Sequence, residues 1–171
     1  MLAMMLTDLQ RRIELGQSPP FPLPQARERK DDDMTQYWLV KSEPDAFSWD
    51  QQVANGVEPW TGVRNHSAKL NLKAMKIGDR AFFYHSNEGK EIVGVVEVVR
   101  EAYPDPTAEK GEWVSVDMKA VGPMPKPVTL AAIKADPQFA DLALVRQSRL
   151  SVVPVSKPHW DRICRMGGWK H

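Results

Sequence analysis

A single cysteine, Cys164, occurs among the 171 residues. One thiol can form neither an intramolecular disulfide nor a cysteine cluster for zinc, which is typical of a reducing compartment, and we expect a cytoplasmic protein. No apolar run approaches the roughly 20 residues that span a bilayer, so no membrane association is expected. The net charge is only +1. This excludes a protein that coats nucleic acid through overall charge, but not one with a local basic patch.

Recognised catalytic motifs are lacking as well. The four histidines (His66, His85, His159 and His171) are not spaced as metal ligands, and there is neither a P-loop nor a nucleophile-elbow motif. His85 follows a tyrosine at the end of an expected strand, where a hydrogen-bonded structural imidazole is favoured over a general base. We therefore expect a protein that is not an enzyme and needs no metal or other cofactor.

The first 33 residues differ in composition from the rest. They pass from a weakly apolar start through the proline-rich SPPFPLP to a charged run at positions 27–33. Such biased tracts usually stay solvated, so a disordered leader, or a true start at Met34, is favoured over an interaction arm. We predict one folded domain, residues 34–171, and expect it to be a monomer.

From Met34 onward, strand and helix signals alternate. Ser48 and Gln51 have the spacing of a capping box, and Gly56 can end the helix that they begin. We expect strands at residues 37–40, 81–84, 92–99, 113–118 and 149–153, and helices after Ser48, through Ala68, Leu72 and Met75, after Thr129, and from Ser156 to just before Gly167.

Two features indicate that the strands are irregular. Gly94 marks a bulge or a close backbone approach, and Pro123, Pro125 and Pro127 are expected to forbid a continuous ladder. Because strands dominate, we predict a mixed α+β fold of the broad α/β class. Its expected form is a small curved β-barrel of about five or six strands, closed on itself, with helices packed around it.

The stretch EPWTGVRNHSAK, residues 58–69, contains aromatic, basic and amide side chains that a turn does not require. Trp60 is expected at a rim, where its indole can stack on a planar ligand; an equally favoured interpretation makes it a core side chain that plugs the barrel. Arg64 offers a planar donor fork for phosphate or a base edge, and Asn65 a donor–acceptor pair for a base edge. Gly62 lets a ligand approach the backbone closely.

Long motifs along the folded part resemble the EVE domain family. They are YWLVKSEPDAFSWD, EPWTGVRNHSAKLNLKAMKIGDRAFFYHS, IVGVVEV, WVSVD and LVRQSRLSVVPVS, in the family's order from about Tyr37 to the last helix. The resemblance implies a PUA-like barrel related to the YTH readers of methylated RNA, and a role in binding modified bases, notably modified cytosine such as 5-methylcytosine in DNA. His66 departs from the family, which often has tyrosine there, so stacking by this residue is left open.

The same resemblance implies a base pocket built from three segments. It would consist of the strand end Lys41, Ser42 and Glu43, the rim Trp60, Thr61 and Gly62, and the strand end Tyr84, His85 and Ser86. Arg64, Asn65, Ser148 and Arg149 would face the same opening and contact phosphate or base edges. Stacking on Trp60 and hydrogen bonds to base edges would offset the cost of extruding the base.

The segment from Arg146 onward holds six Lys or Arg residues against one acid, Asp161, a net charge of +5. It predicts a phosphate-facing patch, with a solvated helix face as the equally favoured alternative. We predict a non-catalytic reader that binds nucleic acid carrying a modified base, above all modified cytosine in DNA. Two alternatives are left open: a reader of modified RNA, and a small hydrolase that acts on modified nucleic acid through His85 or His66.

Overall fold

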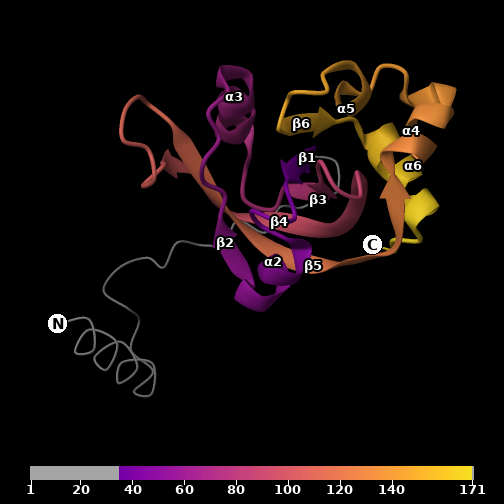
Figure 1. Cartoon of the computed structure of the whole chain (residues 1–171), viewed down its shortest axis with the longest axis horizontal. Helices are drawn as coiled ribbons and strands as arrows, with labels where there is room; N and C mark the ends of the chain where they lie inside the picture. Colours follow the sequence, from indigo (N-terminus) through magenta and orange to yellow (C-terminus); the bar gives the residue numbers. More distant parts are fainter. Residues whose placement is uncertain (1–34, 171) are drawn as a thin grey trace, which may run out of the picture. The chain divides into compact units, whose positions relative to one another are not determined.

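The computed structural model describes residues 35–170; the predicted leader lies outside the described residues. This part of the chain forms one six-stranded sheet with five α-helices (Figure 1), so the predicted mixed α+β class is confirmed. The strands are β1 (Tyr37–Ser42), β2 (Val57–Pro59), β3 (Arg80–His85), β4 (Glu91–Pro104), β5 (Val114–Thr129) and β6 (Val152–Val155). The helices are α2 (Trp49–Asn55), α3 (His66–Ala74), α4 (Leu130–Ala135), α5 (Ala143–Arg146) and α6 (Lys157–Gly167), with a 3₁₀ turn, η2 (Pro137–Phe139). None of the described helices has the length and apolar character needed to cross a membrane.

The sheet is open, so the prediction of a closed barrel is wrong. The strand order is β2-β5-β4-β3-β1-β6, and β2 and β6 are unpaired to each other within the described residues. The edges are short: β2 pairs with β5 over three positions and β6 with β1 over four. β1 and β3 are parallel, and the other neighbours are antiparallel. Short edges contribute few ladder hydrogen bonds.

The long hairpin of β4 and β5 contains the predicted irregularities. The register of β4 shifts beside Gly94 on both of its neighbours, and a Cβ on Gly94 would lie 2.5 Å from ring atoms of Trp49. The bulge and the close approach are both confirmed. β5 continues through its three prolines, but its residues 124–127 have no partner on β4, so the expected break in the ladder is confirmed as well.

The last strand begins later than predicted, at Val152 instead of Arg149. The Leu150 N–H donates to the Gln147 carbonyl at 3.0 Å and closes a turn that contains Ser148 and Arg149. The expectation of a strand from Arg149 is therefore wrong, because a local turn satisfies the backbone before the sheet begins.

Helix caps confirm the predicted helix starts. Ser48 and Gln51 form a reciprocal capping box on α2, and Thr129 and Ser156 accept from the first turns of α4 and α6. α6 ends at Gly167, with Gly168 in the left-handed region as its cap, one residue later than predicted. Trp160 of α6 is fully buried against β1 and β3.

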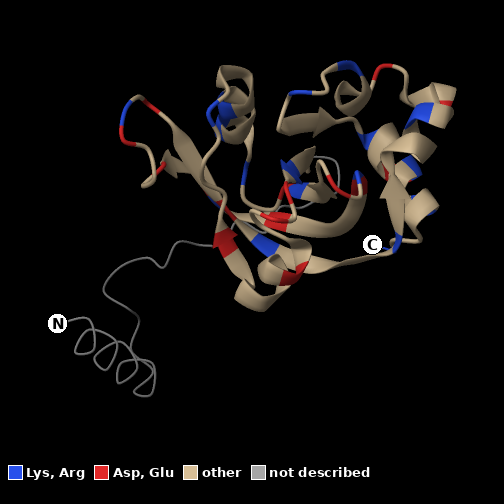
Figure 2. Cartoon of the chain, in the orientation of Figure 1, with Lys and Arg blue, Asp and Glu red and all other residues tan. Residues whose placement is uncertain are grey.

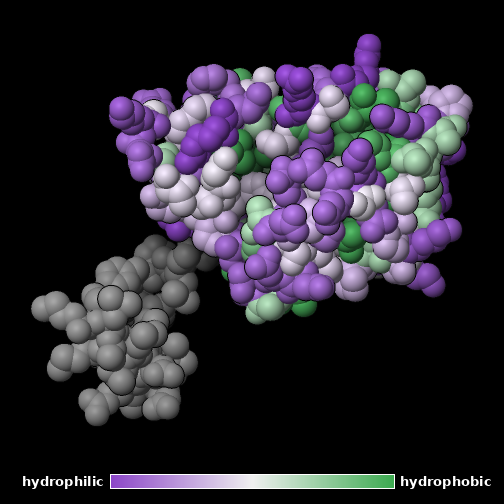
Figure 3. All heavy atoms as spheres, in the orientation of Figure 1, coloured by the Kyte–Doolittle hydropathy of each residue, from purple (hydrophilic) through white to green (hydrophobic). Residues whose placement is uncertain are grey.

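The core lies between the sheet and α6. The Trp160 ring stacks on Phe82 of β3, with centroids 3.9 Å apart, and on Tyr37 of β1 at 4.5 Å. The core also takes in α3: its Ala68 and Leu72, and Met75 just after it, are fully buried, as their helical spacing predicted. Hydrophilic residues predominate on the face drawn in Figure 3, with apolar groups visible between them.

Candidate functional site

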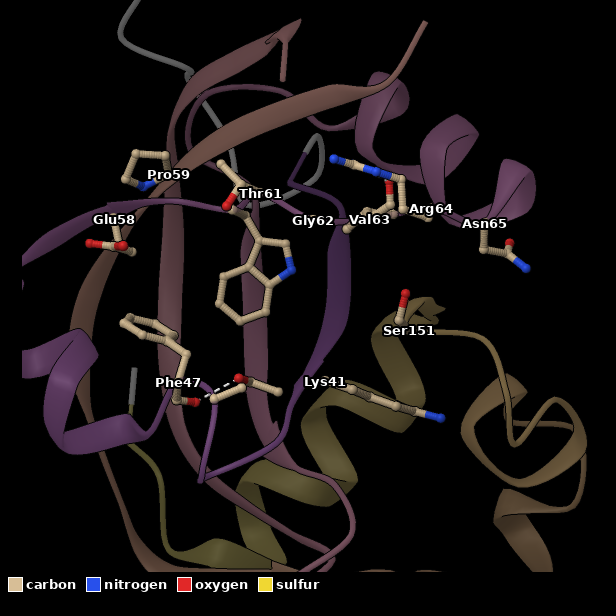
Figure 4. Close-up of a pocket in the computed structure, with 13 residues that line it drawn as sticks. Lys41, Phe47, Glu58, Pro59, Thr61, Gly62, Val63, Arg64, Asn65 and Ser151 are labelled. Atoms are coloured by element: carbon tan, nitrogen blue, oxygen red, sulfur yellow. Dashed lines mark hydrogen bonds between the residues drawn. The ribbon is translucent and has the colours of Figure 1, made fainter. Parts of the chain in front are cut away.

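A pocket of about 440 Å³ lies between edge strand β2 with the segment after it and the end of strand β1 (Figure 4). One wall is formed by residues 58–65, which run from edge strand β2 to the start of α3. The other wall is formed by the end of β1, the loop before α2, and Ser151, next to edge strand β6. The pocket is therefore built from segments that lie far apart in the sequence.

The wall from Trp60 to Asn65 is held by a buried carboxylate on another loop. Asp105 Oδ2 accepts hydrogen bonds from Arg64 Nη1 at 2.8 Å and from the Gly62 N–H at 2.9 Å. Burial alone would raise the pKa of Asp105, but the hydrogen bonds from Arg64, Gly62 and Thr107 hold that pKa well below its usual range. The Trp60 N–H also donates to the Val116 carbonyl at 2.7 Å. The wall is thus ordered before any ligand arrives.

Arg64 lines the pocket, as predicted, but its guanidinium already has several partners. Besides Asp105 it donates to the Val63 carbonyl and, at 3.2 Å, to Thr107 Oγ1. Its side chain is 38% exposed. Gly62 has a φ of 80°, and nothing lies within 4 Å of where a Cβ would stand. The backbone at Gly62 is therefore open to close approach, as the sequence predicted.

Trp60 is both a core residue and a pocket residue. It is 6% exposed, and its ring packs edge-on against Phe83 and Phe47, with centroids 5.6 and 6.2 Å away. It also lines the pocket. No acceptor for the indole N–H lies among the described residues. The two interpretations of Trp60 hold together, and the expectation of an exposed rim position is corrected.

The opposite wall carries two predicted residues, Lys41 and Ser42. Lys41 Nζ donates to the Ser148 carbonyl at 2.9 Å, and burial lowers the pKa of this amine. Ser42 Oγ donates to the Phe47 carbonyl at 2.6 Å, the dashed line in Figure 4. The two hydrogen bonds fasten the end of β1 to the turn at Ser148 and to the loop at Phe47, which lines the pocket.

Four predicted residues, Glu43, Tyr84, His85 and Ser86, do not line the pocket. Glu43 is exposed in a turn, and Tyr84 is buried in β3 beside Lys41. His85 Nε2 accepts from the Trp49 N–H at 3.1 Å, at the first residue of α2. Burial lowers the pKa of His85 although Glu91 and Asp50 act to raise it. The imidazole is a structural acceptor, as the sequence favoured.

Six lining residues were missed by sequence reasoning: Ala46, Phe47, Glu58, Pro59, Val63 and Ser151. Glu58 is the one acid among the described lining residues, and it accepts from Asn55 Nδ2 at 2.9 Å. The position of Glu58, two residues before Trp60, is the signal by which the sequence could have assigned it to the pocket. Phe47 lies in the DAFSWD motif, but no local pattern indicates that this loop folds back to face Trp60.

A second hollow, of about 320 Å³, is lined by Asn65, Ser67 and residues 146–150. Ser148 and Arg149 line this hollow instead of the first, and Asn65 lines both. Asn65 also caps α3, because its Oδ1 accepts from the Ala68 N–H at 3.0 Å. Phosphate contact by Arg149 stays a prediction.

The six basic residues of the C-terminal segment do not form one patch. Arg146 and Arg149 line the second hollow, whereas Arg162 Nε pairs with Asp136 at 2.6 Å and Lys157 with Asp161 at 3.3 Å. Figure 2 shows blue segments divided between the loop beside α5 and the helix α6. The count of +5 holds for the segment, but part of that charge is neutralised in space, because Asp136, which lies outside the segment in sequence, pairs with Arg162.

The histidines named for the hydrolase alternative lie away from the pocket lining. His66 faces Trp113, with ring centroids 5.0 Å apart, and His85 is bound to the backbone of α2. Within residues 35–170 no three His, Cys, Asp or Glu side chains are placed to hold a metal ion. The arrangement can enclose a flat ligand between aromatic rings and polar groups.

The fold and the pocket together define a small α+β domain with a hollow lined by aromatic and polar side chains at the end of β1 and along residues 58–65. The model of the EVE domain family matches residues 36–166, and this chain belongs to the EVE domain family, as the sequence motifs predicted.

Thymocyte nuclear protein 1 from Mus musculus is 34% identical over 164 residues, which are 76% of this chain and 73% of that protein. The solved structure of Rpa0253 from Rhodopseudomonas palustris is 63% identical, has a TM-score of 0.75, and matches 80% of this chain and 97% of its own. The structure of human THYN1 in complex with DNA containing 5-methylcytosine is 30% identical, with a TM-score of 0.73 and coverage of 80% and 100%.

Proposed function

We propose that this protein is a non-catalytic reader that binds modified cytosine in DNA and takes the extruded base into the pocket beside Trp60. The carrying observation is a preformed pocket that combines an aromatic wall with one carboxylate and an open backbone at Gly62. The similarity to human THYN1, which was solved with DNA containing 5-methylcytosine, supports the ligand class. The cost of extruding a base is offset by stacking and by hydrogen bonds to its edges.

The pocket chemistry favours a base with an exocyclic amine. Glu58 supplies a carboxylate that can accept from the N4 amine of cytosine, whereas thymine and uracil present a carbonyl at that position. Trp60 and Phe47 supply apolar ring surface, against which a 5-methyl group can pack. Asn65 uses its Oδ1 for the helix cap, so its amide N–H groups remain for a ligand.

A reader of modified RNA is the second candidate. A YTH domain from Zygosaccharomyces rouxii, solved with N6-methyladenosine RNA, matches 87% of this chain with a TM-score of 0.52 at 15% identity. That likeness extends to the fold alone. An RNA reader needs a partner for the 2′-hydroxyl of the ribose. A direct comparison of binding to DNA and to RNA therefore decides between the two candidates. A monomeric, cytoplasmic protein stays our prediction.

The test is a binding titration with four matched single-stranded oligonucleotides: DNA and RNA, each with cytosine or 5-methylcytosine at one position. We expect the methylated DNA to bind most tightly. Equal binding of methylated and unmethylated DNA would overturn the proposal, and tighter binding of methylated RNA would favour the second candidate. Product formation from any of the oligonucleotides would favour the hydrolase alternative.

Glu58→Gln tests the role of the carboxylate. The variant keeps an oxygen for Asn55 but loses the charge, so binding of the methylated DNA should weaken roughly tenfold, the order expected for a charge-assisted hydrogen bond. Glu88→Gln is the matched control, because Glu88 is an exposed acid in the turn between β3 and β4 and does not line the pocket. Equal losses in both variants would show that only overall charge matters.

A further inference from the structure

The second hollow has the composition of an anion site. Its lining includes the two arginines Arg146 and Arg149, the hydroxyl groups of Ser67 and Ser148, and the amide of Asn65. Leu150 is its one apolar residue, and no acid is among the described residues that line it. Guanidinium forks with nearby hydroxyl donors are the groups that bind phosphate oxygens in proteins.

The two arginines of the second hollow are available for a ligand. Neither guanidinium has an ion pair or hydrogen bond with any of residues 35–170, and both side chains are exposed. This sets them apart from Arg64, which is bound to Asp105, and from Arg162, which is bound to Asp136. Cations without a carboxylate partner keep their full attraction for an anion.

The second hollow adjoins the base pocket through shared walls. Asn65 lines both, and consecutive residues, Leu150 and Ser151, line one each. Lys41, from the base pocket, donates through Nζ to the carbonyl of Ser148, which lines the second hollow. A ligand whose flat part fills the first hollow and whose anionic part is one sugar away can therefore reach the second.

The geometry points to a phosphate subsite in the second hollow, which holds a phosphate of the same nucleotide whose base occupies the pocket. Arg146 and Arg149 bind the phosphate oxygens, with Ser67, Ser148 and the Asn65 amide as neutral donors. The unit recognised is then a modified nucleotide, not a base alone. This inference rests on the proposed function, and it adds Arg146 and Ser67 to the residues expected to contact the ligand.

The test compares 5-methyl-2′-deoxycytidine with its 5′- and 3′-monophosphates by calorimetric or NMR titration of the full chain. We expect at least one monophosphate to bind roughly tenfold or more tightly than the nucleoside. In the double variant Arg146→Ala/Arg149→Ala, monophosphate binding should fall to the level of the nucleoside, with nucleoside binding unchanged. Arg165→Ala is the matched control, because Arg165 is exposed on α6 and lines neither hollow.

Each outcome decides the inference. Equal binding of nucleoside and monophosphates, or no binding of any of the three, overturns the phosphate subsite. An equal loss in the Arg165→Ala control also overturns it, since the effect would then be one of overall charge. The proposed function is tested separately, by the oligonucleotide titration, and equal binding of methylated and unmethylated DNA to the wild-type protein would overturn it. Thermal unfolding of the double variant verifies that it is folded.

Discussion

Arg64 donates to the buried carboxylate of Asp105 across 2.8 Å, although 41 positions separate the two residues in the chain. The same carboxylate oxygen accepts from the Gly62 N–H at 2.9 Å. One buried acid from the loop after β4 thereby holds the pocket wall that follows β2. Arg64, which the sequence assigned to a ligand, therefore stabilises the pocket wall through Asp105 in the folded protein.

Arg64→Ala should destabilise the protein. The substitution leaves Asp105 buried without its charge partner, which costs roughly 3–5 kcal/mol for a fully buried pair. Arg64 is 38% exposed, so we expect a smaller loss of unfolding free energy, about 2–3 kcal/mol. Urea titration measures it. Lys76→Ala, which breaks the exposed pair with Glu101, is the control and should change stability by less than about 1 kcal/mol. Similar losses in both variants would contradict a special role for Arg64.

His85 should make the stability depend on pH. Burial lowers its pKa from the ordinary 6.5, so as the pH falls below that value the unfolded chain gains a proton before the folded protein does. The free energy of unfolding therefore decreases as the pH drops from 6.5 toward the lower folded pKa. Protonation also removes the Nε2 acceptor of the Trp49 N–H. His85→Gln, which does not titrate, should flatten this part of the stability profile; an unchanged slope would refute the assignment.

Trp60→Ala should now affect both stability and binding. Because the indole is 6% exposed and packs on Phe47 and Phe83, its truncation should cost about 3–5 kcal/mol of stability. Stacking on a base contributes about 1–3 kcal/mol in aromatic platforms for single strands. Binding of methylated DNA should therefore weaken even after correction for the folded fraction.

Trp60→Phe separates the two effects of that substitution. It keeps a ring in the core and should cost less stability than the alanine variant, while the indole N–H is lost. Thermal unfolding and affinity are measured on the same samples. A folded alanine variant with wild-type affinity would remove Trp60 from the proposed base site.

Gly94→Ala should disturb the packing behind the pocket. The added Cβ would lie 2.5 Å from ring atoms of Trp49, so the indole has to move. Overpacking of this kind costs about 1–3 kcal/mol. A changed near-ultraviolet circular dichroism signal and a lower melting temperature are the expected observations. Gly89→Ala, in a turn where the nearest atoms are 3.6 Å away, should leave the aromatic signal unchanged despite its backbone strain.

Local sequence determined the starts of three described helices, α2, α4 and α6, and the family. A helix cap depends on residues within about four positions, so Ser48, Thr129 and Ser156 could be assigned without tertiary contacts. The stretch around Trp60 was recognisable as a pocket segment because its residue types suit a base edge, and most of that stretch does line the pocket. The long motifs of the EVE domain are likewise readable from the sequence alone, and the family model matches residues 36–166.

Tertiary structure alone decided which side chains remain free for a ligand. Arg64 is engaged by Asp105 and Arg162 by Asp136, while Arg146 and Arg149 are unpaired among the described residues. The same applies to the pocket walls, which come from edge strand β2 with the segment after it and from the end of β1 with its neighbouring loops. Ion pairing and wall formation depend on distances in space between residues far apart in the chain, and composition and local pattern carry no information on such distances.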